Sequence, residues 1–174
     1  LGQYKEAYQS AQSLLRAGKS TEAGKGFERA MALAATPADR INAEIGVGVA
    51  LDAGRDYPTA RGKFEKVLMA DSATSGQKAE ARCRIGMAWY NERQYSQARA
   101  ELERVTASAD APATWKTQAA LFIGHSWWRE NKYPEAREAY TRALGVPDIS
   151  PAAQASARLA IVNILFAEKR YADA

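Results

Sequence analysis

The chain has 174 residues, of which 47% are hydrophobic and 25% are charged. This length and composition suit one globular domain with a sizeable core and exclude a disordered chain. The formal net charge is only +4, and basic and acidic residues are interspersed at helical spacing. The sequence therefore lacks the basic stripe that nucleic-acid-binding proteins carry, and no apolar run approaches the ~20 residues of a membrane span.

The residues that carry chemistry are few. Cys83 and His125 are the only cysteine and histidine, so the chain can form neither an internal disulfide nor a histidine-based metal cluster. Each glycine stands alone, which excludes a phosphate-binding loop, and no acidic residue stands in an apolar context that would raise its pKa. We therefore expect no enzymatic activity and no cofactor or metal.

Three columns of residues recur along the chain every 38 residues. The first is a tyrosine, the second is an alanine three residues later, and the third is a glycine twelve residues before the alanine. Three columns in phase indicate a tandem repeat of one supersecondary unit. The columns are Tyr57, Tyr95, Tyr133 and Tyr171; Ala60, Ala98, Ala136 and Ala174, with Ala23 37 residues before the first; and Gly48, Gly86 and Gly124.

Each unit is predicted to hold two amphipathic helices. Apolar residues such as Ala60, Phe64, Val67 and Leu68 follow the i, i+4, i+7, i+8 spacing of a buried helical stripe. Proline preceded by a capping residue, as in Ser150-Pro151, marks helix starts. The predicted first helices are 3–17, 38–54, 76–92, 113–130 and 151–168, and the second helices are 20–35, 57–70, 95–108 and 133–145. The units of this single domain, 1–174, are 3–37, 38–75, 76–112, 113–150 and an incomplete 151–174.

Glycine inside a helix costs about 1 kcal/mol relative to alanine. Its recurrence in the first helices therefore predicts that another helix comes too close for a Cβ. We expect the alanine column of the second helix to make this contact. Larger residues would fill the remaining volume, namely Leu51, Trp89 and Trp127 on the first helices and Phe27, Phe64 and Tyr140 on the second.

These motifs resemble the tetratricopeptide repeat (TPR). Ile123-Gly124 with Trp127 follows the Leu-Gly-x2-Tyr motif of that family's first helix, and Ala136 with Tyr140 follows the Ala-x3-Phe motif of its second helix. The period of 38 rather than 34 and the missing leading tryptophan are departures. Sel1-like repeats have a similar period, but their glycine-rich turn is absent. The resemblance implies an all-α, right-handed solenoid of stacked helical hairpins that binds proteins and is not catalytic.

In that family the first helices line a concave groove that binds a peptide or a partner protein. Tyr90, Trp128 and Phe166 recur at 38 residues, and aromatic and arginine residues are typical interface anchors. We expect Trp128 to face the groove and Trp127 the core, and we leave Trp115 unassigned. The groove residues implied by the resemblance are Tyr8, Gln12, Arg16, Ile45, Val49, Asp52, Cys83, Met87, Tyr90, Asn91, Leu121, His125, Trp128, Arg129, Asn163 and Phe166.

The incomplete fifth unit would expose apolar residues such as Leu159 and Phe166. A repeat needs a neighbour or a cap, so we expect further chain, a partner or a second copy to cover it. Self-association through this unit is therefore the alternative to a peptide-binding groove, and nucleic-acid binding is disfavoured. A clamp for a C-terminal carboxylate is not expected, because the positions equivalent to Lys5 hold Asn42, Glu80 and Gln118. We also expect the sequence to be a piece of a longer protein.

Overall fold

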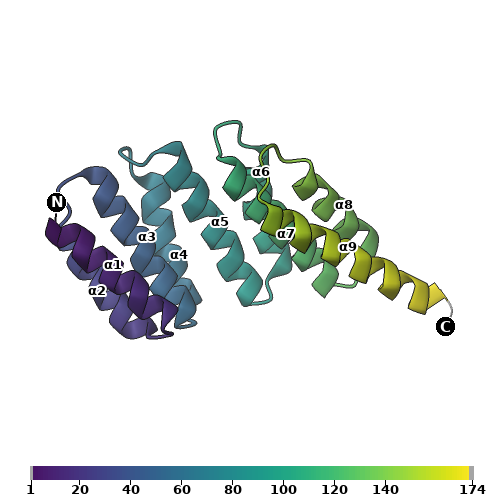
Figure 1. Ribbon diagram of the computed structural model, residues 1–174, viewed down its shortest axis with the longest axis horizontal. Helices are drawn as coiled ribbons and strands as arrows, with labels where there is room; N and C mark the ends of the chain where they lie inside the picture. Colours follow the sequence, from purple (N-terminus) through teal and green to yellow (C-terminus); the bar gives the residue numbers. More distant parts are fainter. Residues whose placement is uncertain (1, 173–174) are drawn as a thin grey trace.

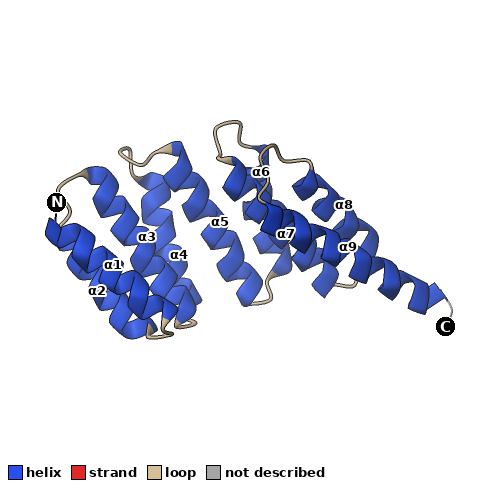
Figure 2. Cartoon of the chain, in the orientation of Figure 1, coloured by secondary structure: helices blue, strands red, loops and turns tan. Residues whose placement is uncertain are grey.

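The computed structural model describes residues 2–172, and all regular structure in this range is α-helical (Figure 2). The first eight helices begin and end within three residues of the predicted bounds. The first helices of the repeats are α1 (Gly2–Arg16), α3 (Pro37–Ala53), α5 (Ser75–Asn91), α7 (Ala113–Arg129) and α9 (Pro151–Ala172), and the second helices are α2 (Ser20–Ala32), α4 (Tyr57–Met69), α6 (Tyr95–Ala107) and α8 (Tyr133–Leu144).

The helices stack in chain order into an elongated solenoid (Figure 1). Each helix packs against the next, and each first helix also contacts the first helix of the following repeat. Within the described residues, second helices make no such contacts with one another. The row of first helices is therefore the shorter, inner side of the solenoid, as the resemblance implies. No helix in the described range is both long enough and apolar enough to cross a membrane.

The same turn joins the two helices of every complete repeat. After α5, the Arg93 N–H donates to the Tyr90 carbonyl and the Gln94 N–H donates to the Trp89 carbonyl, both at 2.9 Å, which is a Schellman motif. Arg93 has a left-handed backbone with φ of 62°. This turn ends the helix sharply and directs the chain back along it. The equivalent left-handed residues are Gly18, Arg55 and Asn131, with φ of 75°, 66° and 60°.

The fifth repeat departs from the sequence period. The columns predict a turn just before Tyr171, but α9 continues through Ala172. Lys169 stands where Arg93 turns in the third repeat, and it remains helical. A left-handed residue other than glycine costs about 1–2 kcal/mol. In the earlier repeats the packing of the second helix against the first offsets this cost.

The starts of α3, α5 and α9 carry the expected serine or threonine caps, whereas the N-cap residues of α2, α6, α7 and α8 make no side-chain cap hydrogen bond. Thr74 and Gln77 form a reciprocal capping box before α5. Thr36 caps α3, and the Ala153 N–H donates to Ser150 Oγ at 3.2 Å before α9. These caps satisfy N–H groups that the helix itself leaves free, and they explain why serine and threonine precede the helices.

The glycine column lets the two helices of a repeat approach closely. A Cβ on Gly86 would lie 2.6 Å from Leu102 Cγ, and a Cβ on Gly124 would lie 2.6 Å from Tyr140 Cε1. The glycine thus makes room for a large residue of the second helix. This residue stands four positions after the alanine of the alanine column. The large residue makes the closest contact, and the column alanine makes the expected contact only at Gly86, where the Ala98 carbonyl oxygen would lie 3.2 Å from the added Cβ. Ala23, Ala60, Ala98 and Ala136 are fully buried, and their small size lets the helices close around the large side chain. Ala174 lies outside the described residues.

Sequence reasoning missed a recurring contact between repeats. The Arg99 guanidinium lies 3.4 Å from the centre of the Trp127 ring, and its Nη1 is 2.5 Å from Glu130 Oε2. Arg99 is only 8% exposed, so its charge is compensated by a carboxylate and an aromatic face rather than by water. Arg61 makes the same two contacts with Trp89 and Glu92, and Arg137 pairs with Glu168 at 3.1 Å.

Substitution of the glycines tests the close approach. Gly62 lies inside α4 with nothing within 4 Å of its added Cβ, so Gly62→Ala should raise the free energy of unfolding by about 0.5–1 kcal/mol. Gly86→Ala and Gly124→Ala should lower it by about 1–3 kcal/mol, because the new methyl group overlaps a fully buried side chain. Urea denaturation followed by circular dichroism measures both effects. Stabilisation by Gly86→Ala would contradict the packing described here.

Candidate interaction surface

The inner side of the first helices is the surface that a partner could reach. Three of the residues expected to line it, Ile45, Cys83 and Leu121, are buried, with exposures of 4%, 0% and 7%. They occupy equivalent positions in α3, α5 and α7 and belong to the hydrophobic clusters between helices. These three assignments are corrected: the residues pack beneath the inner surface and do not line it.

In α5 and α7 the residue that follows this position lies closer to the surface, whereas Gly46, which follows Ile45 in α3, is buried. Arg84 follows Cys83 and Phe122 follows Leu121, and both are half-buried. A helical side chain leans toward the N-terminus of its helix, so a given surface spot is covered by a residue about one position further along than a simple wheel suggests. Sequence reasoning therefore missed Arg84 and Phe122, although the 38-residue spacing between them was visible in the sequence.

The remaining predicted residues are accessible to different degrees, and they extend along the whole row of first helices. Half-buried residues have one face available to a ligand. They are Tyr8, Gln12, Val49, Asp52, Met87, Tyr90, His125 and Trp128, whereas Arg16, Asn91, Arg129, Asn163 and Phe166 are exposed.

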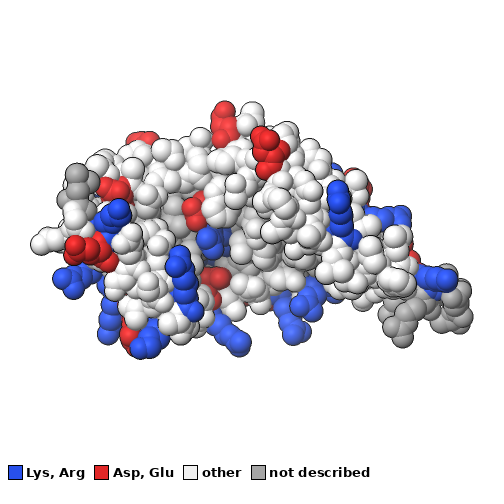
Figure 3. Space-filling view, viewed as in Figure 1, with Lys and Arg blue, Asp and Glu red and all other residues white. Residues whose placement is uncertain are grey.

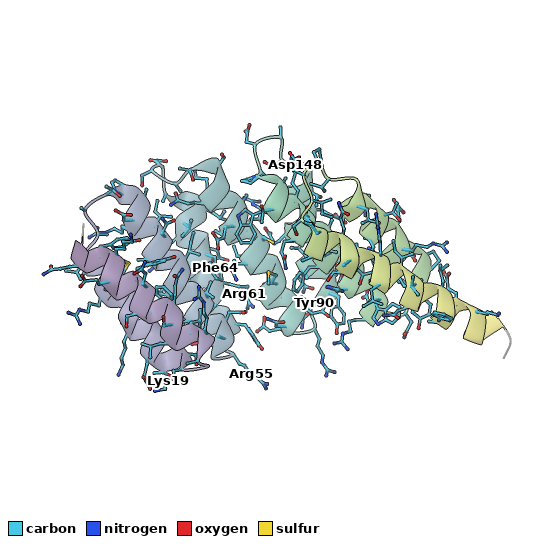
Figure 4. All side chains as sticks on the ribbon, in the orientation of Figure 1. Lys19, Arg55, Arg61, Phe64, Tyr90 and Asp148 are labelled. Atoms are coloured by element: carbon cyan, nitrogen blue, oxygen red, sulfur yellow. The ribbon has the colours of Figure 1, made fainter. Side chains whose placement is uncertain are left out.

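The structure brings two predicted groove residues, Tyr90 and His125, together with Phe122, whereas the predicted Tyr8 contacts Phe27 in the first repeat and Phe166 lies on α9. Tyr90 of α5 contacts Phe122 of α7 edge to face, with ring centres 5.3 Å apart (Figure 4 labels Tyr90). Phe122 contacts His125 at 5.5 Å, and His125 contacts Tyr140 at 5.4 Å. We call Tyr90, Phe122, His125 and Trp128 the aromatic cluster. It joins the third repeat to the fourth on the inner side.

A small pocket adjoins the aromatic cluster. Its volume is about 230 Å³, and its lining includes His125, Trp128 and, from α9, Ala160 and Asn163. At the edge of the cluster Arg129 Nε donates to Tyr90 Oη at 3.2 Å, and the Arg129 side chain is exposed. The site therefore offers a small recess with a mixed apolar and polar lining, and one cation lies beside it.

The middle of the inner side is polar. Arg84 donates to Glu80 at 3.2 Å within α5, and Asn91 donates to Asp52 across to α3 at 3.4 Å. Figure 3 shows acidic and basic side chains close together in a hollow over this region. Burial raises the pKa of Asp52. This corrects our expectation that no acidic residue has surroundings that raise its pKa. Charges of opposite sign here offset one another.

Cys83 is fully buried, so its thiol is not accessible to a substrate. Burial raises the pKa of the Cys83 thiol to about 12, so the reactive thiolate is not formed at neutral pH. Within the described residues no group of three histidine, cysteine or acidic side chains could hold a metal ion.

Two tryptophans pack on the core of the solenoid. Trp127 packs under Arg99, and Trp115, which the sequence left unassigned, packs on the core with the Arg84 guanidinium 5.5 Å from its ring centre.

His125 gives the aromatic cluster a pH-dependent stability. Burial, and then the nearby Arg129, lower its pKa below the ordinary value of 6.5, and Nδ1 shares a 2.7 Å hydrogen bond with Tyr140 Oη. As the pH falls from 7 to 5, the unfolded chain takes up a proton before the folded chain does, so stability falls.

Comparison with His125→Gln isolates this effect. Thermal denaturation at pH 7 and pH 5 should show a smaller loss of stability for His125→Gln than for the wild type. The raised pKa of Asp52 has the opposite effect, because it increases the stability of the folded chain as the pH falls. Asp52 is present in both proteins, so its contribution cancels when their stabilities are compared. Parallel pH profiles would show that the imidazole does not titrate differently in the two states.

No protein-family model matches the sequence, and no curated protein matches it. Solved structures do match its fold. PilF of Pseudomonas aeruginosa superimposes with a TM-score of 0.72 at 18% identity, over 98% of this chain and 71% of PilF. A putative kinesin light chain from Podosopora anserina with nearly identical TPR-like repeats gives 0.70 at 15%, over 97% and 88%. MamA from Desulfovibrio magneticus RS-1 gives 0.61 at 20%, over 97% and 96%. The chain is therefore an all-α solenoid of TPR-like helical repeats.

Proposed function

We propose that the chain is a protein-interaction scaffold whose inner side binds a peptide segment of a partner. The observation that carries this proposal is the aromatic cluster with its adjoining pocket, both reachable from the inner side. Aromatic side chains bury much surface at little conformational cost, which is why they anchor protein interfaces. Tyr90, Phe122, His125 and Trp128 are only half-buried, so part of their aromatic surface is available to a ligand.

The chemistry of the cluster favours a particular kind of segment. The pocket of about 230 Å³ suits one apolar side chain, and its polar contacts would come from His125 and Asn163. Arg129 stands beside it with an exposed guanidinium, which suits a carboxylate or a main-chain carbonyl of the ligand. The expected ligand is therefore a segment with an apolar anchor next to an acidic residue. The polar middle, around Arg84 and Asp52, would contact the rest of the segment through hydrogen bonds.

Selection from a displayed library of twelve-residue random peptides tests the proposal. The wild-type chain should enrich peptides with an apolar anchor and an adjacent acidic residue. Trp128→Ala should weaken their binding by about 10-fold or more, as expected for an interface anchor. Arg129→Ala should weaken binding in proportion to the acidic content of the peptide. Isothermal titration calorimetry on the enriched peptides measures both effects.

Met69→Ala serves as the matched control, because Met69 is 81% exposed and lies on a second helix, outside the inner side. It should leave the affinities unchanged. Circular dichroism should show unchanged helicity for all three variants. Peptides that bind Trp128→Ala as tightly as the wild type would refute the proposal, and so would a library that yields no specific binder.

A further inference from the structure

Each turn inside the first four repeats carries one exposed basic residue at one of two adjacent positions. The first position is the left-handed residue after the first helix, and the second is the N-cap residue of the second helix. Arg55 and Arg93 hold the first position, whereas Lys19 and Lys132 hold the second. Every turn thus keeps one cation, although its position changes from repeat to repeat. We call these four residues the turn cations.

Local structure disfavours a basic residue at both positions. A left-handed residue is best a glycine or an asparagine, and Gly18 and Asn131 stand there in the other two turns. An N-cap residue should accept a hydrogen bond, as Asp56 does before α4, but Lys19 and Lys132 form no such cap. The helix dipole also opposes a cation at an N-terminus. A basic residue that stands against local preference in every turn indicates a role outside the fold.

The turn cations contribute little within the fold. All four are exposed, and within the described residues the two arginines form no ion pair. Lys19 pairs with the exposed Glu22 at 3.7 Å, and Lys132 Nζ lies 4.8 Å from the centre of the Trp127 ring. Exposed pairs add little stability. The second helices also carry a basic residue in the last turn, where it complements the helix dipole. The dipole therefore accounts for those residues and not for the turn cations.

The hairpin architecture places the turn cations along one edge of the molecule. Because the two helices of a repeat are antiparallel, the turns inside the repeats lie at one long edge and the loops between repeats lie at the other (Figure 1). Figure 4 labels Lys19 and Arg55 at the lower edge, and Figure 3 shows basic side chains along it. Successive first helices are in contact, and packed helices lie about 10 Å apart. The turn cations therefore form a row with about one charge every 10 Å.

The opposite edge carries the opposite charge. Three of the loops between repeats hold one exposed aspartate each, namely Asp71, Asp110 and Asp148, and these loops hold no basic residue. Figure 3 shows acidic side chains along this upper edge, where Figure 4 labels Asp148. A first helix of 17 residues is about 25 Å long, or about three Debye lengths at physiological ionic strength. The aspartates therefore do not neutralise the row of turn cations.

We propose that the edge formed by the turn cations binds the surface of an anionic lipid bilayer. The turn cations lie against the headgroups, and the aspartates of the opposite edge point away from the membrane. Each basic residue held near such a surface strengthens binding by about fivefold. The inner side stays open to a peptide in this orientation. The membrane site is therefore separate from the aromatic cluster and does not depend on it.

Other anionic partners fit this edge less well. A second copy of the chain could offer only the three aspartates of its opposite edge, and exposed ion pairs contribute too little to offset the cost of association. The phosphate backbone of a nucleic-acid duplex winds once around its axis in about 34 Å. A row of cations about 30 Å long therefore meets each strand about once. Lipid headgroups are mobile, so that every turn cation can contact an anion.

Binding to lipid vesicles tests the proposal. Sedimentation at about 0.1 M salt compares vesicles of phosphatidylcholine containing about 30% phosphatidylglycerol with vesicles of phosphatidylcholine alone. The wild-type chain should bind the anionic vesicles at least about 10-fold more strongly than the neutral ones, and binding should weaken as the salt concentration rises. Trp128→Ala should bind the vesicles as the wild type does, because the aromatic cluster takes no part.

A quadruple variant removes the turn cations and preserves the turns. Lys19→Ser and Lys132→Ser introduce a preferred N-cap residue, and Arg55→Asn and Arg93→Asn introduce the residue that Asn131 provides in the fourth repeat. This variant should bind anionic vesicles at least about 50-fold more weakly than the wild type. Its thermal midpoint should rise, because each new residue suits the local backbone better than the one it replaces.

The matched control also removes one exposed basic residue from each repeat. It takes them from the last turns of the second helices, at the opposite edge, as Arg29→Gln, Lys66→Gln, Arg104→Gln and Arg142→Gln. Both quadruple variants lower the formal net charge from +4 to 0. The control should bind anionic vesicles within about 3-fold of the wild type, because these residues lie far from the bilayer. Its thermal midpoint should not rise, because favourable interactions with the helix dipoles are lost.

Equal losses of binding in the two quadruple variants would overturn the proposal, because net charge alone would then explain the binding. Equal binding to neutral and anionic vesicles, or no binding to anionic vesicles even at low salt, would also overturn it. Competition with a 30-base-pair DNA duplex provides the remaining outcome. If an equimolar duplex displaces the wild-type chain from the vesicles, the turn cations belong to a nucleic-acid site and not to a membrane site.

Discussion

The close approach of two helices over a column of glycines is the contact on which the rest of this structure depends. Gly86 and Gly124 have no Cβ, so Leu102 and Tyr140 can lie directly against the backbone of the first helix. The apolar surface that this contact buries offsets the cost of glycine inside a helix. The hairpins of the second, third and fourth repeats are closed by it in the same way, whereas in the first repeat Gly26 of α2 lies against Ala11 of α1.

Identical hairpins determine how neighbouring repeats meet. The Arg99 guanidinium, between the Trp127 ring and Glu130, connects α6 to α7, and Arg61 connects α4 to α5 in the same manner. First helices also contact one another, whereas second helices do not. The inner side is therefore the crowded one. Residues of successive first helices become neighbours there, and this is how Tyr90 and Phe122, 32 positions apart, come to form one aromatic cluster.

The sequence predicted the periodic part of the structure well, because the tyrosine, alanine and glycine columns each reflect a packing requirement. It predicted the inner side less well. Cys83 and Leu121 were expected at the surface and are buried, whereas Arg84 and Phe122 were missed, because an error of one residue rotates a helix by about 100°. The pairing of Arg99 with Trp127, and the burial that raises the pKa of Asp52, depend on which helices adjoin each other. Neither follows from the pattern within a single helix.

In the fifth repeat the sequence pattern no longer predicts the structure. Tyr171 continues the tyrosine column, and that column alone predicts a turn and another hairpin of the same kind. Val162 is incompatible with that packing, because the three preceding repeats need glycine at this position to accept a large side chain. In a repeat protein, a position that breaks a packing rule changes which neighbour can be accepted while leaving the helix itself intact. Helix α9 keeps its inner contacts through the fully buried Ala157 and Ile164, as the equivalent residues of the earlier first helices do.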